Sequence, residues 1–217
     1  MDPQAQLLVL AKEPRPGRTK TRLSPPLTPA QCAQVADASL RDTLAAVAAT
    51  PALARTVVLD GAPGDWLPAG VDVLPQRGGT LGDRLDGAFA DAFAARPLPL
   101  LLVGMDTPQV TPALLARALD DLLRPGTDAV LGLAEDGGWW ALGLRAPQPG
   151  AFDGVPMSTD RAGAAQRARL DALGLRTTGL PVLRDVDLVA DLTAVAASLP
   201  PGAHLAGVVR ELGLVAA

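Results

Sequence analysis

Short apolar runs alternate with longer amphipathic segments along the chain. The runs have the length of buried strands and are bounded by Gly, Pro and Asp residues, whereas the segments between them carry apolar residues at helical spacing. Strands are expected at residues 7–11, 56–59, 71–74, 98–103, 129–133 and 139–144. Strands that alternate with helices are typical of βαβ units, so the pattern predicts an α/β fold with a mixed, mainly parallel sheet covered on both faces.

Capping residues mark where the expected helices begin and end. Thr28 precedes a proline and is a typical helix start. Ser158 or Thr159 can cap a later helix that stops at Gly174, and Asp187 can cap the one after it. Helices are expected over about residues 29–49, 80–95, 111–123, 159–173, 188–197 and 203–212.

Composition fits one globular domain over residues 1–217, with 48% hydrophobic and 19% charged residues. The apolar runs are much shorter than the ~20 residues of a membrane span, and the N-terminus lacks the basic start and apolar stretch of a signal peptide. We therefore expect a cytoplasmic protein without a membrane span. Nothing in the sequence indicates an oligomeric state.

The bulk charge and the rare residues narrow the chemistry further. The formal net charge is −4, and no extended basic or basic-aromatic tract is present, which argues against nucleic-acid binding and favours a small partner. Cys32 is the single cysteine and lies in an alanine-rich helical pattern, so a buried apolar role is expected. The single histidine, His204, has no acid or nucleophile motif nearby. Zinc sites and Ser-His-Asp triads are therefore not expected.

The two lysines of the chain, Lys12 and Lys20, both lie in a basic segment after the first expected strand. All other cations are arginines, and a lysine offers a compact ammonium where arginine offers a planar fork. Residues 12–22 contain one acid, Glu13, and five cations, namely Lys12, Arg15, Arg18, Lys20 and Arg22. The segment lacks the glycine pattern of a P-loop or a dinucleotide loop, so phosphate binding here must rely on side-chain cations. The alternative is a solvated charged loop.

Aspartates follow two of the extended segments. Asp106 comes directly after the most apolar run and is either a metal ligand or part of an Asx turn. Asp185 and Asp187 alternate along an extended stretch, which puts both carboxylates on one side, although Asp187 can also cap a helix. Hard oxygen donors with few histidines favour Mg²⁺ or Mn²⁺ over zinc.

Three further segments carry candidate ligand contacts. Residues 134–140 read Ala-Glu-Asp-Gly-Gly-Trp-Trp, which suits either a tight antiparallel hairpin with core tryptophans or the binding of a polar ring such as a sugar. Residues 76–84 combine Gln76 with glycines that allow close approach to a nucleobase, a weak signal by itself. Residues 157–160 are either a ligand contact or a helix cap.

The order of these motifs resembles one family of bacterial transferases. The motifs are A-[KR]-x-P-x-P-G-x-x-K-T-R-L at residues 11–23, a Q-x-G-x-L-G-x-R-like segment at 76–84, G-x-D-x-P at 104–108, A-E-D-G-G and two aromatics at 134–140, S-T-D at 158–160 and D-V-D at 185–187. The family is that of the radical-SAM and selenium-domain-associated (arsenosugar-biosynthesis-type) transferases, within the nucleotide-diphospho-sugar transferase superfamily. The resemblance implies the GT-A fold, a three-layer αβα sandwich.

The resemblance also implies roles for individual residues. Asp106 and Asp187 would bind Mg²⁺ or Mn²⁺, and Glu135 or Asp136 would act on the acceptor hydroxyl. The nucleotide-binding set would be Lys12, Pro16, Gly17, Arg18, Lys20, Arg22, Gln76, Gly79 and Arg84. The acceptor-binding set would be Gly137, Gly138, Trp139, Ser158, Thr159 and Asp160.

Three functions remain open from the sequence. The first is a metal-dependent glycosyltransferase that uses a nucleotide-sugar donor and a small-molecule acceptor. The second is a nucleotidyltransferase that acts on a nucleoside triphosphate and releases pyrophosphate. The third is a catalytically inactive nucleotide-binding protein. The first two need the same basic segment and the same metal, because each breaks a bond at a phosphate.

Overall fold

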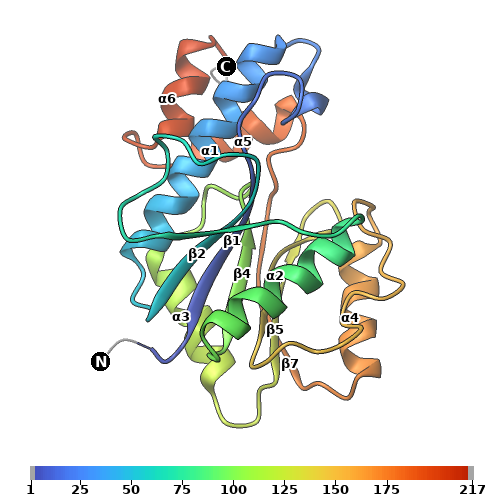
Figure 1. Ribbon diagram of the computed structural model, residues 1–217. Coiled ribbons are helices and arrows are strands. Elements are labelled where there is room, and N and C mark those ends of the chain that lie inside the picture. The colour runs from blue at the N-terminus through green and yellow to red at the C-terminus, as the bar shows by residue number, and fades with distance from the viewer. Residues whose placement is uncertain (1–2, 215–217) are drawn as a thin grey trace.

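In the computed structural model, which describes residues 3–214, seven strands form one mixed sheet with helices on both faces (Figure 1). The strands are β1 (Gln6–Lys12), β2 (Ala54–Asp60), β3 (Asp72–Pro75), β4 (Leu100–Gly104), β5 (Ala129–Ala134), β6 (Trp139–Leu144) and β7 (Thr177–Leu183). Their order in the sheet is β3-β2-β1-β4-β6-β5-β7. Strand β6 runs antiparallel to both of its neighbours, and the other pairs are parallel.

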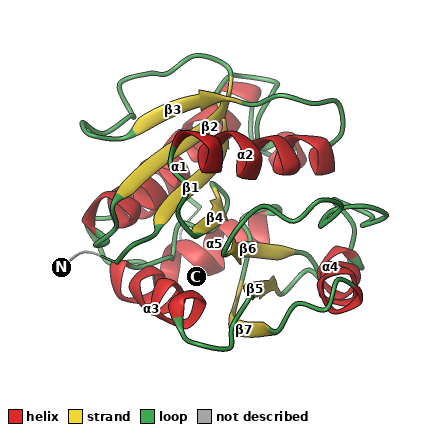
Figure 2. Cartoon of the chain, turned by 60° about the horizontal axis from the view of Figure 1, so that its bottom comes forward, coloured by secondary structure: helices red, strands yellow, loops and turns green. Residues whose placement is uncertain are grey.

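Six α-helices and one short 3₁₀ turn complete the described part of the chain. They are η1 (Thr21–Leu23), α1 (Pro29–Ala49), α2 (Leu81–Ala95), α3 (Pro112–Leu123), α4 (Ala162–Ala172), α5 (Val189–Ser198) and α6 (His204–Glu211). Helices α1 and α3 cover one face of the sheet, and α2 and α4 cover the other (Figure 2). This is the predicted three-layer αβα fold.

The apolar runs are continuous because the central strands are buried on both faces. Along β1, Leu7 and Val9 pack in the cluster under α1 and α3, while Leu8 packs in the cluster under α2. The predicted hairpin at residues 134–140 is confirmed as the β5–β6 connection. Cys32 is buried, as expected.

A third apolar cluster fixes the two segments that carry candidate site residues. Leu23, just after the basic segment, and Val186, between the two aspartates, are both fully buried against α1, α5 and α6. Because each anchor lies within three positions of charged side chains, the cluster holds Lys20, Arg22, Asp185 and Asp187 at one edge of the sheet. Packing of the last two helices therefore shapes the site from a distance.

Two predicted helix starts are wrong. Helix α4 begins after Arg161, because the Thr159 hydroxyl donates to the Pro156 carbonyl at 2.7 Å and closes a turn instead of capping the helix. Helix α5 is preceded by Leu188, whose N–H donates to the Asp191 carboxylate at 2.9 Å. Asp187 is therefore not the helix cap. Strand β7, at the sheet edge, was absent from the expected strands.

Within residues 3–214, no helix is long and apolar enough to cross a membrane.

Candidate functional site

A pocket of about 840 Å³ opens at the carboxyl ends of β1 and β4. The chain runs from β1 to β2 and β3 on one side and then returns to place β4 on the other side of β1, so this is a point where the strand order reverses. Open α/β sheets bind ligands at such points. The walls come from the segments after β1 and β4, the β5–β6 hairpin, the start of α2, residues 157–160 and residues 185–191.

Cations line the wall that the N-terminal half of the chain contributes. Lys12 is the last residue of β1, and no ion pair of its ammonium occurs among the described residues. Arg18 is largely exposed, and its nearest carboxylate oxygen, on Asp60, lies 4.0 Å away. Arg84, on α2, lies 3.3 Å from the other oxygen of Asp60. Lys12 and Arg18 are therefore available to an anionic ligand.

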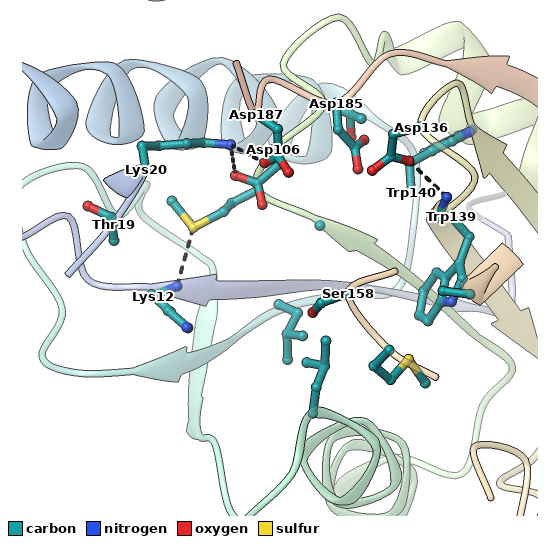
Figure 3. A pocket seen from close by; sticks show the side chains of 18 of the residues that line it. Lys12, Thr19, Lys20, Asp106, Asp136, Trp139, Trp140, Ser158, Asp185 and Asp187 are labelled. Atoms are coloured by element: carbon teal, nitrogen blue, oxygen red, sulfur yellow. Dashed lines mark hydrogen bonds and ion pairs between the residues drawn. The ribbon is translucent and has the colours of Figure 1, made fainter. Parts of the chain in front are cut away.

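Lys20 differs from the other cations because its side chain is only 5% exposed. Its ammonium forms an ion pair with Asp106, donates to the Val186 carbonyl and lies 3.9 Å from the Asp187 carboxylate (Figure 3). The backbone of Lys20 is left-handed, with φ of 52°. Outside glycine, Ser158 is the other described residue with positive φ, at 60°, and it also lines the pocket. Such conformations collect at functional sites.

Four carboxylates face this part of the pocket, from Asp106, Asp136, Asp185 and Asp187. The Oδ1 atom of Asp185 is buried and has no hydrogen-bond partner among the described residues. Burial raises the pKa of Asp185 to about 7, with further contributions from the negative charges of Asp106 and Asp136. The arrangement therefore carries negative charge that a bound cation would stabilise.

The donor chemistry of this cluster fits Mg²⁺ or Mn²⁺, since carboxylate oxygens are the ligands that these ions prefer. Across residues 3–214, however, no group of three His, Cys, Asp or Glu side chains is arranged to hold a metal ion. The Lys20 ammonium pairs with Asp106 and lies 3.9 Å from Asp187. It therefore competes with a cation for these two carboxylates.

The opposite wall is built around the β5–β6 hairpin. Asp136 lies in the turn, where its Oδ1 accepts a hydrogen bond from the Gly138 N–H at 2.8 Å. Trp139 lines the pocket and stacks on Phe152, with ring centroids 6.4 Å apart. Trp140 is buried, and its indole N–H donates to the Pro181 carbonyl at 2.9 Å. Both tryptophans thus line the pocket, but Trp139 is half-buried whereas Trp140 is 2% exposed and is anchored in the core.

Most predicted site residues come together in this one pocket. Those that line it are Lys12, Arg18, Lys20, Arg22, Gln76, Gly79, Arg84, Asp106, Asp136, Gly138, Trp139, Ser158, Thr159, Asp160 and Asp187. Four of the predicted residues do not line it, namely Pro16, Gly17, Glu135 and Gly137. The predicted nucleotide, metal and acceptor residues therefore share one cavity, although they come from six separate segments of the chain.

The four other residues have structural explanations. Glu135 forms an ion pair with Arg184, with Nε and Oε2 2.6 Å apart, so the structure does not bring it into the pocket. Gly137 lies against residues 160–163, and a Cβ there would come 2.0 Å from the Asp160 carbonyl oxygen. Pro16 and Gly17 are exposed and form the bend of the basic segment. Gly137 therefore holds the hairpin against the loop that carries Asp160.

Gln76 lines the pocket, but its amide is already partly used. The Nε2 group donates to the carbonyls of Ala11 and Val58, at 2.8 and 3.1 Å. Its side chain thus ties the end of β3 to β1 and β2, and only the amide oxygen is left for a ligand.

Sequence reasoning did not include several residues that line the pocket. The residue pattern pairs Asp185 with Asp187 as a candidate cation ligand, but the family resemblance assigns the metal only to Asp106 and Asp187. Apolar residues contribute a further part of the lining, among them Leu10, Leu81, Leu85, Leu102, Met105 and Met157. No sequence signal distinguishes these from core residues, because a pocket wall and a buried face have the same apolar pattern.

A family profile described as "Uncharacterized protein conserved in bacteria (DUF2064)" matches residues 32–159, which is more than half of the chain. The chain belongs to this family. The matched region contains the glycine segment at 76–84, Asp106 and the β5–β6 hairpin. No curated protein sequence matches the chain.

Solved structures place this DUF2064 member among nucleotide-handling folds. A protein from Desulfovibrio desulfuricans G20, provisionally assigned as a nucleotide-diphospho-sugar transferase, is 26% identical, with 99% of this chain and 97% of that one covered and a TM-score of 0.88. Two more distant structures share the fold. CMP:2-keto-3-deoxy-manno-octonic acid synthetase, complexed with CTP, is 13% identical over 90% of this chain and 98% of that one, with a TM-score of 0.54. The 2-C-methyl-D-erythritol 4-phosphate cytidylyltransferase of Thermus thermophilus is 19% identical over 91% and 98%, with a TM-score of 0.53.

Proposed function

We propose that this protein is a metal-dependent transferase that takes a nucleotide-diphospho-sugar as donor and passes the sugar to a small-molecule acceptor. The observation that carries the proposal is the pocket itself, in which the available cations Lys12 and Arg18 lie opposite a group of carboxylates. A nucleoside diphosphate and its divalent cation need both kinds of group. The full-length similarity to the Desulfovibrio protein supports the same substrate class, and the motif order supports the radical-SAM-associated group of transferases.

The basic wall would bind the diphosphate. Lys12, Arg18 and Arg84 present positive charge to the pocket and would stabilise the negative charge that develops on the leaving group. Gly79 lies beside Gln76 at the start of α2, where the absence of a side chain leaves room for a nucleobase. The donor would thus extend from the start of α2 toward the carboxylate group.

Asp106 and Asp187 would hold Mg²⁺ or Mn²⁺, and we add Asp185 to this set because its buried Oδ1 has no partner among the described residues. When bound, the ion would act as a Lewis acid toward the diphosphate oxygens.

Asp136 would orient the acceptor and take its proton, since it lines the pocket whereas Glu135 is paired with Arg184 outside it. The acceptor oxygen would form a bond to the anomeric carbon of the sugar. The bond from that carbon to the diphosphate oxygen would break, with its electron pair remaining on the nucleoside diphosphate. The acceptor proton would pass to the Asp136 carboxylate.

Nucleotidyl transfer is the second candidate, and the basic segment favours it. Four cations of the segment, Lys12, Arg18, Lys20 and Arg22, line the pocket, and together they suit the larger charge of a triphosphate. In that reaction, the acceptor oxygen would attack the α-phosphorus, and pyrophosphate would leave. The same fold serves the cytidylyltransferases described above.

Product analysis separates these candidates. The protein is incubated with Mg²⁺ and panels of nucleotide sugars or nucleoside triphosphates, in the presence of a mixture of small alcohols. Release of nucleoside diphosphate from a nucleotide sugar would support the proposal, whereas pyrophosphate release from a triphosphate would support the second candidate. Nucleotide binding by calorimetry without either product would indicate a catalytically inactive nucleotide-binding protein. An Asp106→Asn variant serves as the control for metal-dependent release.

A further inference from the structure

The pocket is divided by charge. The lining cations are Lys12, Arg18, Lys20, Arg22 and Arg84. All of them come from residues before position 85. The lining segment from 136 to 162 contributes the acids Asp136 and Asp160 and no cation. The acceptor side of the pocket, which this segment forms, is therefore negative, and the cations that line the pocket come from the donor side. The other lining acids, Asp106, Asp185, Asp187 and Asp191, follow β4 and β7.

The arginines nearest this side in the chain do not line the pocket. Arg184 is paired with Glu135 at 2.6 Å, and Arg169 donates to the Gly150 carbonyl at 2.6 Å. Arg161, which directly follows Asp160, does not line the pocket. An acceptor that carries a phosphate or carboxylate would therefore lose its hydration on this side and find no cation in exchange, which costs free energy.

The same side offers apolar surface to a ligand. Trp139 and Met157 line the pocket there and are half-buried. The ring of Trp139 is supported by Phe152, with an interplanar angle of 24°, so it presents a firm apolar face. Aromatic faces of this kind bind apolar or aromatic groups and the apolar faces of rings.

We propose that the acceptor is a small molecule without phosphate or carboxylate groups, neutral or cationic, whose apolar or aromatic part lies against Trp139 and whose hydroxyl faces Asp136. The assignment of this side to the acceptor rests on the proposed function, in which the donor fills the basic side. The charge and surface of the subsite exist whichever bond of the nucleotide breaks.

Three phenols of the same size test the proposal, because they share a ring and differ in charge. Tyramine is cationic, tyrosol is neutral and 4-hydroxyphenylacetate is anionic near neutral pH. Their binding is measured by saturation-transfer NMR titration of the full chain, without nucleotide and again with a nucleoside diphosphate and Mg²⁺. Tyramine and tyrosol are expected to bind about tenfold more tightly than the anion, because the carboxylate meets Asp136 and Asp160 at close range.

Two variants identify the subsite. The Trp139→Ala substitution should weaken the binding of all three phenols. The Asp160→Lys substitution should remove or reverse the weaker binding of the anionic phenol. Asp160 is exposed, so the lysine is compatible with folding. Asp153→Lys is the matched control, since Asp153 is an exposed acid of the same loop that does not line the pocket, and it should leave the ranking unchanged.

Equal or tighter binding of the anion by the unmodified protein would overturn the proposal, as would a ranking that Asp160→Lys leaves unaltered. Absence of saturation transfer from all three phenols would refute the apolar subsite. The titrations with nucleotide test the proposed function separately. Failure to bind any nucleotide would refute that function. The order of the three phenol affinities measured without nucleotide would still decide whether the subsite disfavours anions.

Discussion

The Lys20 ammonium is paired with the Asp106 carboxylate at the centre of the candidate site. It also contacts the Val186 carbonyl, and the Asp187 carboxylate lies 3.9 Å away. A guanidinium is larger and planar, so a lysine suits this narrow position better than an arginine does. Lys20 thus neutralises part of the carboxylate group from within the protein.

We expect the Lys20→Met substitution to raise the affinity of the nucleotide-free protein for Mn²⁺ by about tenfold, because a competing positive charge is removed from Asp106 and Asp187. Methionine keeps a long apolar stem in the buried position. Titration of Mn²⁺ followed by electron paramagnetic resonance measures the affinity without any turnover.

Arg15→Met is the control for Lys20→Met, because Arg15 belongs to the same basic segment but pairs with Glu13 outside the pocket. Its Mn²⁺ affinity should equal that of the unmodified protein. A Lys20→Met protein that binds Mn²⁺ more weakly would mean that Lys20 organises the carboxylates and does not compete with the cation.

The Asp106→Ala substitution should abolish the dependence of nucleotide binding on Mg²⁺. The carboxylate lies directly after β4 at the point where the strand order reverses, and it is the closest charged partner of Lys20. Calorimetric titration of a nucleoside diphosphate, with and without Mg²⁺, gives the two affinities. Asp72→Ala removes an exposed carboxylate that pairs with Arg96 on the far edge of the sheet and should change neither value. If Mg²⁺ still strengthens nucleotide binding by the Asp106→Ala protein, Asp106 is not a metal ligand.

Much of the fold followed from local pattern. Helices α1, α2 and α3 begin where the sequence predicts because the capping threonine of each lies next to the helix in the chain. The Thr28 hydroxyl, for example, accepts a hydrogen bond from the Gln31 N–H at 3.3 Å. Strand β7 has a Gly and a Pro within an otherwise alternating stretch, and Pro181 is tolerated because β7 lies at an edge. The order of strands in the sheet depends on packing between distant segments, which no local pattern encodes.

The candidate site was partly visible in the sequence for a topological reason. Charged residues that directly follow parallel strands must meet at one edge of the sheet, as Lys12 and Asp106 do. The pairing of Lys20 with Asp106 could not be foreseen, because it depends on the anchoring of Leu23 against α1 and α5. The different burial of Trp139 and Trp140, both of which line the pocket, depends likewise on what packs against each face of the sheet.

Asp185→Asn should stabilise the metal-free protein at pH 8 and have little effect at pH 4. The folded-state pKa of Asp185 is about 7, whereas an unfolded aspartate titrates near 3.9, so the folded protein binds the extra proton between these values. The stability contributed by the protonated group is therefore lost as the pH rises from about 4 to about 7. Above that range the free energy of unfolding of the Asp185→Asn protein should exceed that of the unmodified protein by on the order of 2 kcal/mol. This value allows for partial exposure of the carboxylate.

Urea unfolding in the presence of a chelator, at pH 4, 6 and 8, measures the difference between the two proteins. Asp153→Asn, an exposed acid away from the pocket, should show no such pH-dependent difference. Addition of Mg²⁺ at pH 8 should stabilise the unmodified protein more than the Asp185→Asn variant. If the two metal-free proteins are equally stable at pH 8, the charged Asp185 carboxylate does not destabilise the folded protein, and the prediction is wrong.

Gly137→Ala should destabilise the protein by about 3 kcal/mol, because strain and a backbone clash act together. The residue has φ of 89°, and an added Cβ would come 2.0 Å from the Asp160 carbonyl oxygen. Gly17→Ala is the matched control, since Gly17 has a similar φ of 74° but nothing within 4 Å of an added Cβ, and it should cost only about 1 kcal/mol. Urea unfolding gives both values. If the two substitutions lower the free energy of unfolding equally, the contact between the hairpin and residues 160–163 does not constrain Gly137. That contact would then not explain how Asp136 and Asp160 are held on the same side of the pocket.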